Sequence, residues 1–176
     1  MSVIACLGWG SLIWDPDGLP VTKWHDDGPG LPIEFARLSG GDRVTLVVMP
    51  DGPRVTVLWT VLEVETLADA VAALRRREKT KSDWIGRWPA SSRPYPYNDE
   101  IGPWAEAQGV DAVVWTAIPP KWDDENGRIP SEDEVVTHLS RLSGAARDEP
   151  YKYIRRAPGQ IQTPYRQALS IVVGDT

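Results

Sequence analysis

Residues 3–16 read VIACLGWGSLIWDP, and they contain the most informative break in the chain. The apolar run at residues 3–7 predicts a buried first strand. That strand stops at GWGS, residues 8–11, and three apolar residues follow. A strand that ends in a glycine-bearing turn can present several backbone N–H groups to one point, where they bind a carboxylate or stabilise an oxyanion. A β-bulge or a tight turn would use the same glycines. The spacing matches neither GxGxxG nor a Walker loop, so it gives no support to nucleotide binding.

The composition predicts a single globular domain over residues 1–176. Apolar residues make up 41% of the chain and charged residues 25%, which is ordinary for a folded domain long enough to bury one core. The net charge of −6 argues against a general nucleic-acid binder. No apolar run reaches the length of a membrane span, and no charged segment followed by an apolar one opens the chain. We therefore expect a soluble, cytoplasmic protein.

The counts of cysteine and histidine argue against a metal centre. Cys6 is the single cysteine, which excludes an intramolecular disulfide framework and a cysteine-based zinc site. His25 and His138 lie far apart in the sequence, so a His-rich metal site is not expected. The chain has nine tryptophans and one phenylalanine. We expect most of the tryptophans, Trp59 and Trp115 in particular, to supply core volume.

Turn residues divide the first part of the chain into predicted strands. Residues 32–38 and 43–49 are joined by the turn SGGD, and residues 54–64 follow the turn PDGP. Neighbouring strands with such short connections predict an antiparallel sheet. Residues 15–30 are rich in Asp, Gly and Pro and are expected to form a loop. The remaining predicted strands span residues 111–118 and 168–173, the second of which would close the domain.

Two capping boxes mark predicted helices. Thr66 with Asp69 begins one that runs to about residue 79, and Ser131 with Glu134 begins another that runs to about residue 142. A third, short helix is expected over residues 149–156. Residues 80–103 contain four prolines and are predicted to be irregular. A loop of that length is either a functional lid or a packed surface loop.

One residue breaks the pattern of the first helix. Leu67, Val71 and Leu74 share a face, and continuing this apolar stripe by four residues reaches Glu78. A carboxylate there would face inward in the last helical turn. Burial and the helix dipole would both raise its pKa, as a general acid/base working near neutral pH requires. Alternatively, the helix ends earlier and Glu78 pairs on the surface with Arg75, Arg77 or Lys81.

Three stretches together resemble the ChaC-type γ-glutamylcyclotransferases. Residues 7–16, LGWGSLIWDP, are similar to the FGYGSLIWxP opening of that family, with Trp9 where the motif has Tyr. Residues 43–47, RVTLV, are similar to its GRVVTLV strand. Residues 74–79, LRRREK, resemble its LxxRE helix end, whose Glu is the catalytic acid/base. Order and approximate spacing agree, and the resemblance covers about residues 3–80.

The resemblance implies a fold and a reaction. The implied fold is α+β, a small mostly antiparallel β-barrel flanked by helices. The implied reaction releases 5-oxoproline from a small-molecule γ-glutamyl substrate, whose own α-amine attacks its γ-carbonyl, without a cofactor or a metal. Glu78 would be the catalytic acid/base. The γ-glutamyl moiety would be held by the backbone N–H groups of the loop that contains Gly8, Trp9, Gly10, Ser11 and Leu12.

Two other functions stay open. The chain could be a non-catalytic member of the fold that binds a small γ-glutamyl-like ligand or a protein partner. It could also be an RNA- or partner-binding module that uses a cluster of cations interleaved with tyrosines, namely Lys152, Arg155, Arg156 and Arg166. A charged surface helix followed by a docked tail would explain the same cluster. The net acidity favours that explanation, and we do not expect nucleic acid as a partner.

Overall fold

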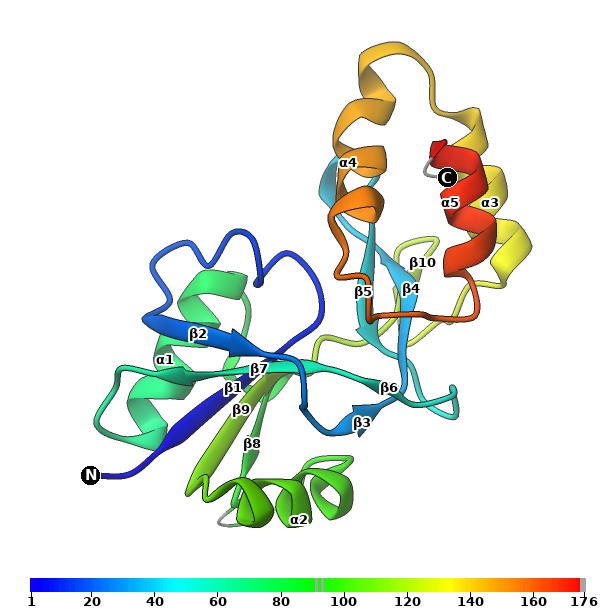
Figure 1. The fold of residues 1–176 in the computed structure, drawn as a ribbon. Helices are drawn as coiled ribbons and strands as arrows, with labels where there is room; N and C mark the ends of the chain where they lie inside the picture. The colour runs from blue at the N-terminus through cyan, green and yellow to red at the C-terminus, as the bar shows by residue number, and fades with distance from the viewer. Residues whose placement is uncertain (91, 93, 175–176) are drawn as a thin grey trace. The chain divides into compact units, whose positions relative to one another are not determined.

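The computed structural model describes residues 1–90, 92 and 94–174, which form two compact units (Figure 1). Unit 1 comprises Met1–Leu31 and Thr56–Ile118, and unit 2 comprises Pro32–Val55 and the chain from Pro119 onward. Residues 91 and 93, which belong to the predicted irregular segment, lie outside the described residues. The single domain expected over residues 1–176 stays a prediction.

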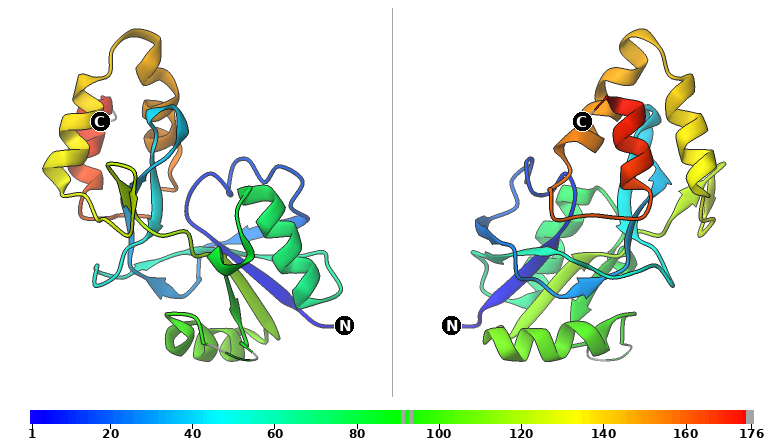
Figure 2. Two further views of the ribbon diagram at one scale, coloured as in Figure 1. Left: turned by 180° about the vertical axis from the view of Figure 1, so that it is seen from behind. Right: turned by 45° about the vertical axis from the view of Figure 1, so that its right-hand side comes forward.

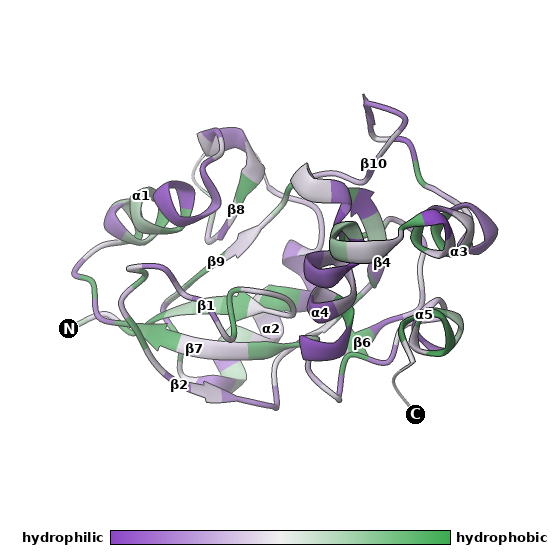
Figure 3. Cartoon of the chain, turned by 90° about the horizontal axis from the view of Figure 1, so that it is seen from above, coloured by the Kyte–Doolittle hydropathy of each residue, from purple (hydrophilic) through white to green (hydrophobic). Residues whose placement is uncertain are grey.

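Unit 1 is built on a five-stranded sheet with the order β2-β7-β1-β9-β8 (Figure 1). The central strand β1 is buried along its whole length; it pairs antiparallel with β7 and parallel with β9. In Figure 3, hydrophobic colour runs along β1 and at both ends of β7. The strands are β1 (Ile4–Gly8), β2 (Val21–His25), β7 (Leu58–Leu62), β8 (Ile85–Trp88) and β9 (Ala112–Thr116).

Two helices pack on opposite faces of this sheet. Helix α1 (Leu67–Glu78) buries Leu74 in one cluster with Cys6 of β1 and Val114 of β9. Successive side chains along a strand point to opposite faces, so Trp115 lies on the other side from Val114. On that side α2 (Asn98–Gln108) contacts β8 and β9, where Gly102 lies against Trp88. Trp59 and Trp115 are buried, as the sequence predicted.

Unit 2 combines a β-hairpin with three helices. Its four-stranded sheet has the order β11-β10-β4-β5, and α5 packs against both α3 and α4 (Figure 2). The strands are β4 (Ile33–Leu38), β5 (Val44–Val48), β10 (Lys121–Trp122) and β11 (Glu125–Asn126), and the helices are α3 (Glu132–Arg141), α4 (Asp148–Arg156) and α5 (Arg166–Val173). A third sheet pairs β3 (Gly30–Leu31) with β6 (Val55–Thr56). Short 3-10 turns span Gly40–Asp42, Ser82–Trp84 and Gly144–Arg147.

The α+β class and the mainly antiparallel pairing are confirmed, but the barrel is not. Among the described residues the strands form three open sheets, and the largest ends at β2 on one side and β8 on the other. The hairpin of β4 and β5 is confirmed, whereas the third strand of that predicted sheet is not part of it. Residues 54–64 instead form β6 and β7, and β7 pairs with β1 and β2.

The predicted closing strand over residues 168–173 is wrong, because this segment is helix α5. Leu169 and Val173 are buried and lie four residues apart, while Ile171 between them is 73% exposed. This is the burial pattern of a helix, and packing has overridden the strand propensity of the β-branched run. The sequence also missed β2, β8 and α2, which occupy segments expected to be loops. Within the described residues, no helix combines the length and the apolar character needed to cross a membrane.

Candidate active site

Glu78 is the last residue of α1, and local sequence signals fix both ends of that helix. Thr66 and Asp69 form the predicted capping box at the start. The helix ends because Lys79 adopts the left-handed conformation, from which its N–H reaches the carbonyls of Arg75 and Arg76. The apolar stripe that includes Leu74 therefore extends to Glu78, whose side chain is only 17% exposed.

The Glu78 carboxylate contacts two other elements of unit 1. Its Oε1 atom accepts a hydrogen bond from the Thr116 hydroxyl at 3.2 Å, at the end of β9. The same oxygen accepts one from Arg77 Nη1 at 3.3 Å. The alternative interpretation placed such an ion pair on the protein surface. The pair is instead largely buried, because the Arg77 side chain is itself only 11% exposed. No ion pair joins Glu78 to Arg75 or Lys81 in the part of the chain that the structure describes.

Burial is the main cause of the raised pKa values of two groups in this site, Glu78 and Cys6. It raises the pKa of Glu78, and the Arg77 charge and the Thr116 hydrogen bond oppose that rise without cancelling it. Cys6 is fully buried and lies close enough to Glu78 for the two groups to interact electrostatically. Burial, with the Glu78 charge as a second cause, holds the pKa of the Cys6 thiol far above its usual range. A thiol in that state is not a nucleophile, which leaves Glu78 as the group suited to proton transfer.

The glycine-bearing loop begins where β1 ends. A Cβ atom on Gly8 would lie 2.7 Å from the Trp24 ring and 2.8 Å from Ile13 Cδ1, so only glycine fits there without a shift. The turn is closed by two backbone hydrogen bonds, from Ile13 N–H to the Gly10 carbonyl and from Asp15 N–H to the Ser11 carbonyl. The side chains of Trp9 and Leu12 are buried.

Three consecutive amides of this loop have no hydrogen-bond partner among the described residues. The backbone N–H groups of Gly10, Ser11 and Leu12 make no hydrogen bond to any residue that the structure describes. Adjacent amides without a partner are what the predicted anion-binding loop requires, and anion binding by this loop stays a prediction.

Topology brings Glu78 and the loop to one edge of the sheet. Strands β1 and β9 are parallel neighbours, so the loop after β1 and Thr116 at the end of β9 lie at the same edge. Arg77 then joins the two parts: its Nη2 donates to the Ser11 hydroxyl at 3.2 Å and its Nε donates to the Asp15 carbonyl at 3.1 Å. The sequence did not identify Arg77 and Thr116 as parts of this site.

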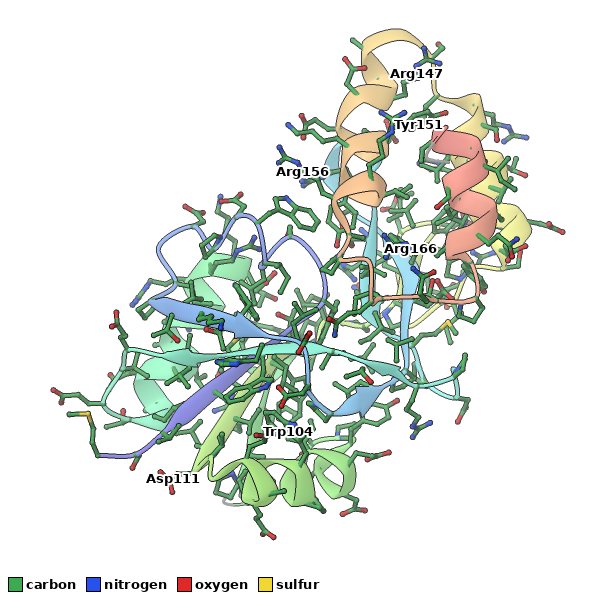
Figure 4. All side chains as sticks on the ribbon, in the orientation of Figure 1. Trp104, Asp111, Arg147, Tyr151, Arg156 and Arg166 are labelled. Atoms are coloured by element: carbon green, nitrogen blue, oxygen red, sulfur yellow. The ribbon has the colours of Figure 1, made fainter. Side chains whose placement is uncertain are left out.

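The cationic cluster of unit 2 is partly committed to the fold. Arg166 is 8% exposed, and its guanidinium donates to the carbonyls of Ala157, Pro158 and Ile161. Arg155 donates to the carbonyl of Val173, and Lys152 pairs with Glu149. Arg147, Tyr151 and Arg156 project from the chain around α4 (Figure 4). Two of the four cations therefore hold backbone carbonyls rather than forming a continuous basic face.

Two searches among known proteins found no relative of this chain. No model of a protein family matches it, and no curated protein is similar in sequence. In the residues that the structure describes, no group of three or more His, Cys, Asp or Glu side chains is placed to hold a metal ion.

A solved structure does match. It is a selenomethionine-labelled γ-glutamyl cyclotransferase from yeast that is specific to glutathione, and the match covers 99% of this chain and 96% of that one. The TM-score is 0.52 and the sequence identity is 17%. The two chains share a fold. The γ-glutamyl cyclotransferase fold was the expectation drawn from residues 3–80, and the match extends it to nearly the whole chain.

Proposed function

We propose that this protein is a γ-glutamylcyclotransferase-like enzyme that releases 5-oxoproline from a γ-glutamyl amide or peptide. The observation that carries the proposal is Glu78, a largely buried carboxylate at the same sheet edge as the unpaired amides of Gly10, Ser11 and Leu12. The shared fold with the yeast enzyme supports it. A buried base beside a cluster of N–H donors is what an intramolecular acyl transfer needs.

The reaction needs proton transfer and orientation, because the substrate carries its own nucleophile. Glu78 takes a proton from the α-ammonium group of the substrate, and the freed amine attacks the γ-carbonyl carbon. A carbon–nitrogen bond forms in the five-membered ring as the bond to the leaving amine breaks. Glu78 returns its proton to the leaving nitrogen, which also receives the second proton that the ring nitrogen loses, so the amine leaves as an ammonium ion and no oxidant or reductant is required.

The loop amides supply the second part of the chemistry. Gly10, Ser11 and Leu12 would hold the substrate's carboxylate or the oxygen that becomes negative during attack. Gly8 leaves room for the Trp24 ring and for Ile13, and the Trp9 side chain is buried. Holding the γ-glutamyl chain in a bent conformation brings the amine to its own carbonyl, which removes much of the entropic cost of ring closure.

The pH dependence follows from Glu78. Only the ionised carboxylate can accept the ammonium proton, and burial raises its pKa above the ordinary glutamate value of 4.5. We expect kcat/KM to rise with pH through this raised pKa, with an acid limb above pH 4.5.

The test is release of 5-oxoproline, measured by mass spectrometry, from a panel of γ-glutamyl compounds that includes glutathione. Wild type, Glu78→Gln and the control Glu65→Gln, which changes an exposed glutamate, run side by side. We expect Glu78→Gln to lose about 10²–10⁴-fold in rate and Glu65→Gln to match wild type. Equal release by Glu78→Gln and wild type would refute the role of Glu78. Silence of folded wild type across the panel would favour the non-catalytic, ligand-binding function.

A further inference from the structure

Arg77 is set apart from the two arginines before it by its surroundings. Arg75 and Arg76 are exposed, whereas the side chain of Arg77 is 11% exposed. Its guanidinium makes hydrogen bonds to three residues: the Ser11 hydroxyl, the Asp15 carbonyl and Glu78 Oε1. Such multiple, planar donation suits arginine and cannot be reproduced by lysine.

The two oxygens of the Glu78 carboxylate differ in their hydrogen bonding. Oε1 is held by Arg77 and by Thr116, as described above. Oε2 makes no hydrogen bond to the described residues. A carboxylate held through one oxygen cannot rotate freely, so the other oxygen keeps one direction in which to receive a proton.

We propose that Arg77 is a positioning residue that locks Glu78 to the loop of residues 8–12 and makes Oε2 the oxygen that exchanges the proton. This inference rests on the proposed function of Glu78. The loop and the base come from segments more than 60 residues apart, and Arg77 is bonded to both. Any movement of one is therefore transmitted to the other through a single guanidinium.

The role of Arg77 can be measured through the pKa of Glu78, because that pKa depends on the charges around the carboxylate. The groups that face its carboxylate are the Arg77 guanidinium from α1, the buried Cys6 thiol from β1 and the Thr116 hydroxyl from β9. Arg77 is the cation in this set, and its charge lowers the pKa of Glu78 against the effect of burial. Replacing Arg77 with a neutral residue would remove this lowering effect, so the pKa of Glu78 should rise further.

The experiment compares Arg77→Met with Arg76→Met, which removes an exposed arginine one position away. Titration of the Glu78 carboxyl carbon by NMR, assigned with Glu78→Gln, reports its pKa whether or not the protein turns over a substrate. We expect the pKa of Glu78 to rise by about one pH unit or more in Arg77→Met and to stay at the wild-type value in Arg76→Met. An unchanged titration in folded Arg77→Met would overturn the inference.

Activity provides a separate readout. If wild type releases 5-oxoproline, the acid limb of kcat/KM should move to higher pH in Arg77→Met by the same amount as the titration. A lower rate with an unmoved acid limb would also overturn the inference, because loss of packing alone gives that result. If wild type releases nothing, the proposed function fails while the titration still tests the contact.

Arg77→Lys covers the case in which Arg77→Met does not fold. Lysine keeps the charge near Glu78 but cannot bond Ser11 and Asp15 together with it. We expect a pKa of Glu78 near the wild-type value, with at least a tenfold loss of kcat/KM for a substrate that wild type turns over, on the order of one lost hydrogen bond to a charged group. Full wild-type kcat/KM in Arg77→Lys would refute a positioning role.

Discussion

Gly86 faces the ring of Trp115 across two paired strands, and replacing it with alanine should destabilise unit 1. The two residues are directly opposite in the register of β8 and β9. A Cβ atom on Gly86 would lie 2.2 Å from Trp115 Cε2, 2.4 Å from its Nε1 and 2.6 Å from its Cζ2. Carbon atoms pack best at about 3.5–4.0 Å, so the ring would have to move by about 1 Å.

The ring has little room for that movement. Trp115 is 1% exposed, and Tyr95 meets it edge-on with the ring centroids 6.1 Å apart. Overpacking of a buried site costs about 1–3 kcal/mol, and alanine recovers about 0.5–1 kcal/mol of backbone entropy relative to glycine. We expect Gly86→Ala to lower the free energy of unfolding by about 1–2 kcal/mol. For a chain of this length that corresponds to about 2–8 °C in melting temperature.

Urea unfolding followed by tryptophan fluorescence and circular dichroism measures this change. Gly159→Ala is the matched control, because no atom lies within 4 Å of its Cβ position and its φ is not positive. It should be neutral or stabilising by up to about 1 kcal/mol. If Gly86→Ala were as stable as Gly159→Ala, Trp115 would have room to move, and the account of the β8–β9 packing would be wrong.

The remaining predictions concern the capping box and a buried acid. Thr66→Ala should cost about 1 kcal/mol of unfolding free energy in the same urea assay, because it removes the cap of α1. Glu34→Ala should cost at least about 2 kcal/mol, since Glu34 accepts from the Thr163 hydroxyl and from the amides of Phe35 and Tyr165. Burial also raises the pKa of Glu34 above 4.5, so its protonated form favours the folded state. Unfolding measured from pH 4 to 7 should therefore show a loss of stability as pH rises from about 4.5 through the raised pKa values of Glu34 and Glu78, and Glu34→Ala should show a smaller loss than wild type.

The sequence located helices best where their signals are local. The capping boxes at Thr66 and Ser131 both form, because a cap needs only residues three positions apart. Helix α2 was missed because Pro103 lies inside it and prolines crowd the segment before it. Strand β2 was missed because its half-buried and exposed residues show no strong apolar run. Its place in the sheet depends on pairing with β7, which is distant in sequence.

The candidate site was predictable only in part for the same reason. Helical periodicity gave the inner face as one of two interpretations of Glu78, and the structure finds its side chain largely buried. The run of three arginines before it contains no information on which one turns inward. That choice depends on contacts with distant parts of the chain: Thr116 is 38 positions from Glu78, and Ser11 is 66 positions from Arg77. Thr116 carried one weak signal, since it is a polar residue that ends an apolar strand.

The loop of residues 8–12 supports the proposal that Trp9 can stand where the resembled motif has tyrosine. The groups proposed to bind the ligand are the amides of Gly10, Ser11 and Leu12, which belong to the backbone. Trp9 is 4% exposed, so its ring lies in the interior. The loop side chains contribute packing and the Ser11 hydroxyl that accepts from Arg77, together with a glycine at position 8 that leaves room for Trp24. Exchange of one large aromatic residue for another preserves the donors as long as the turn keeps its two closing hydrogen bonds, which involve Gly10, Ser11, Ile13 and Asp15 but not residue 9.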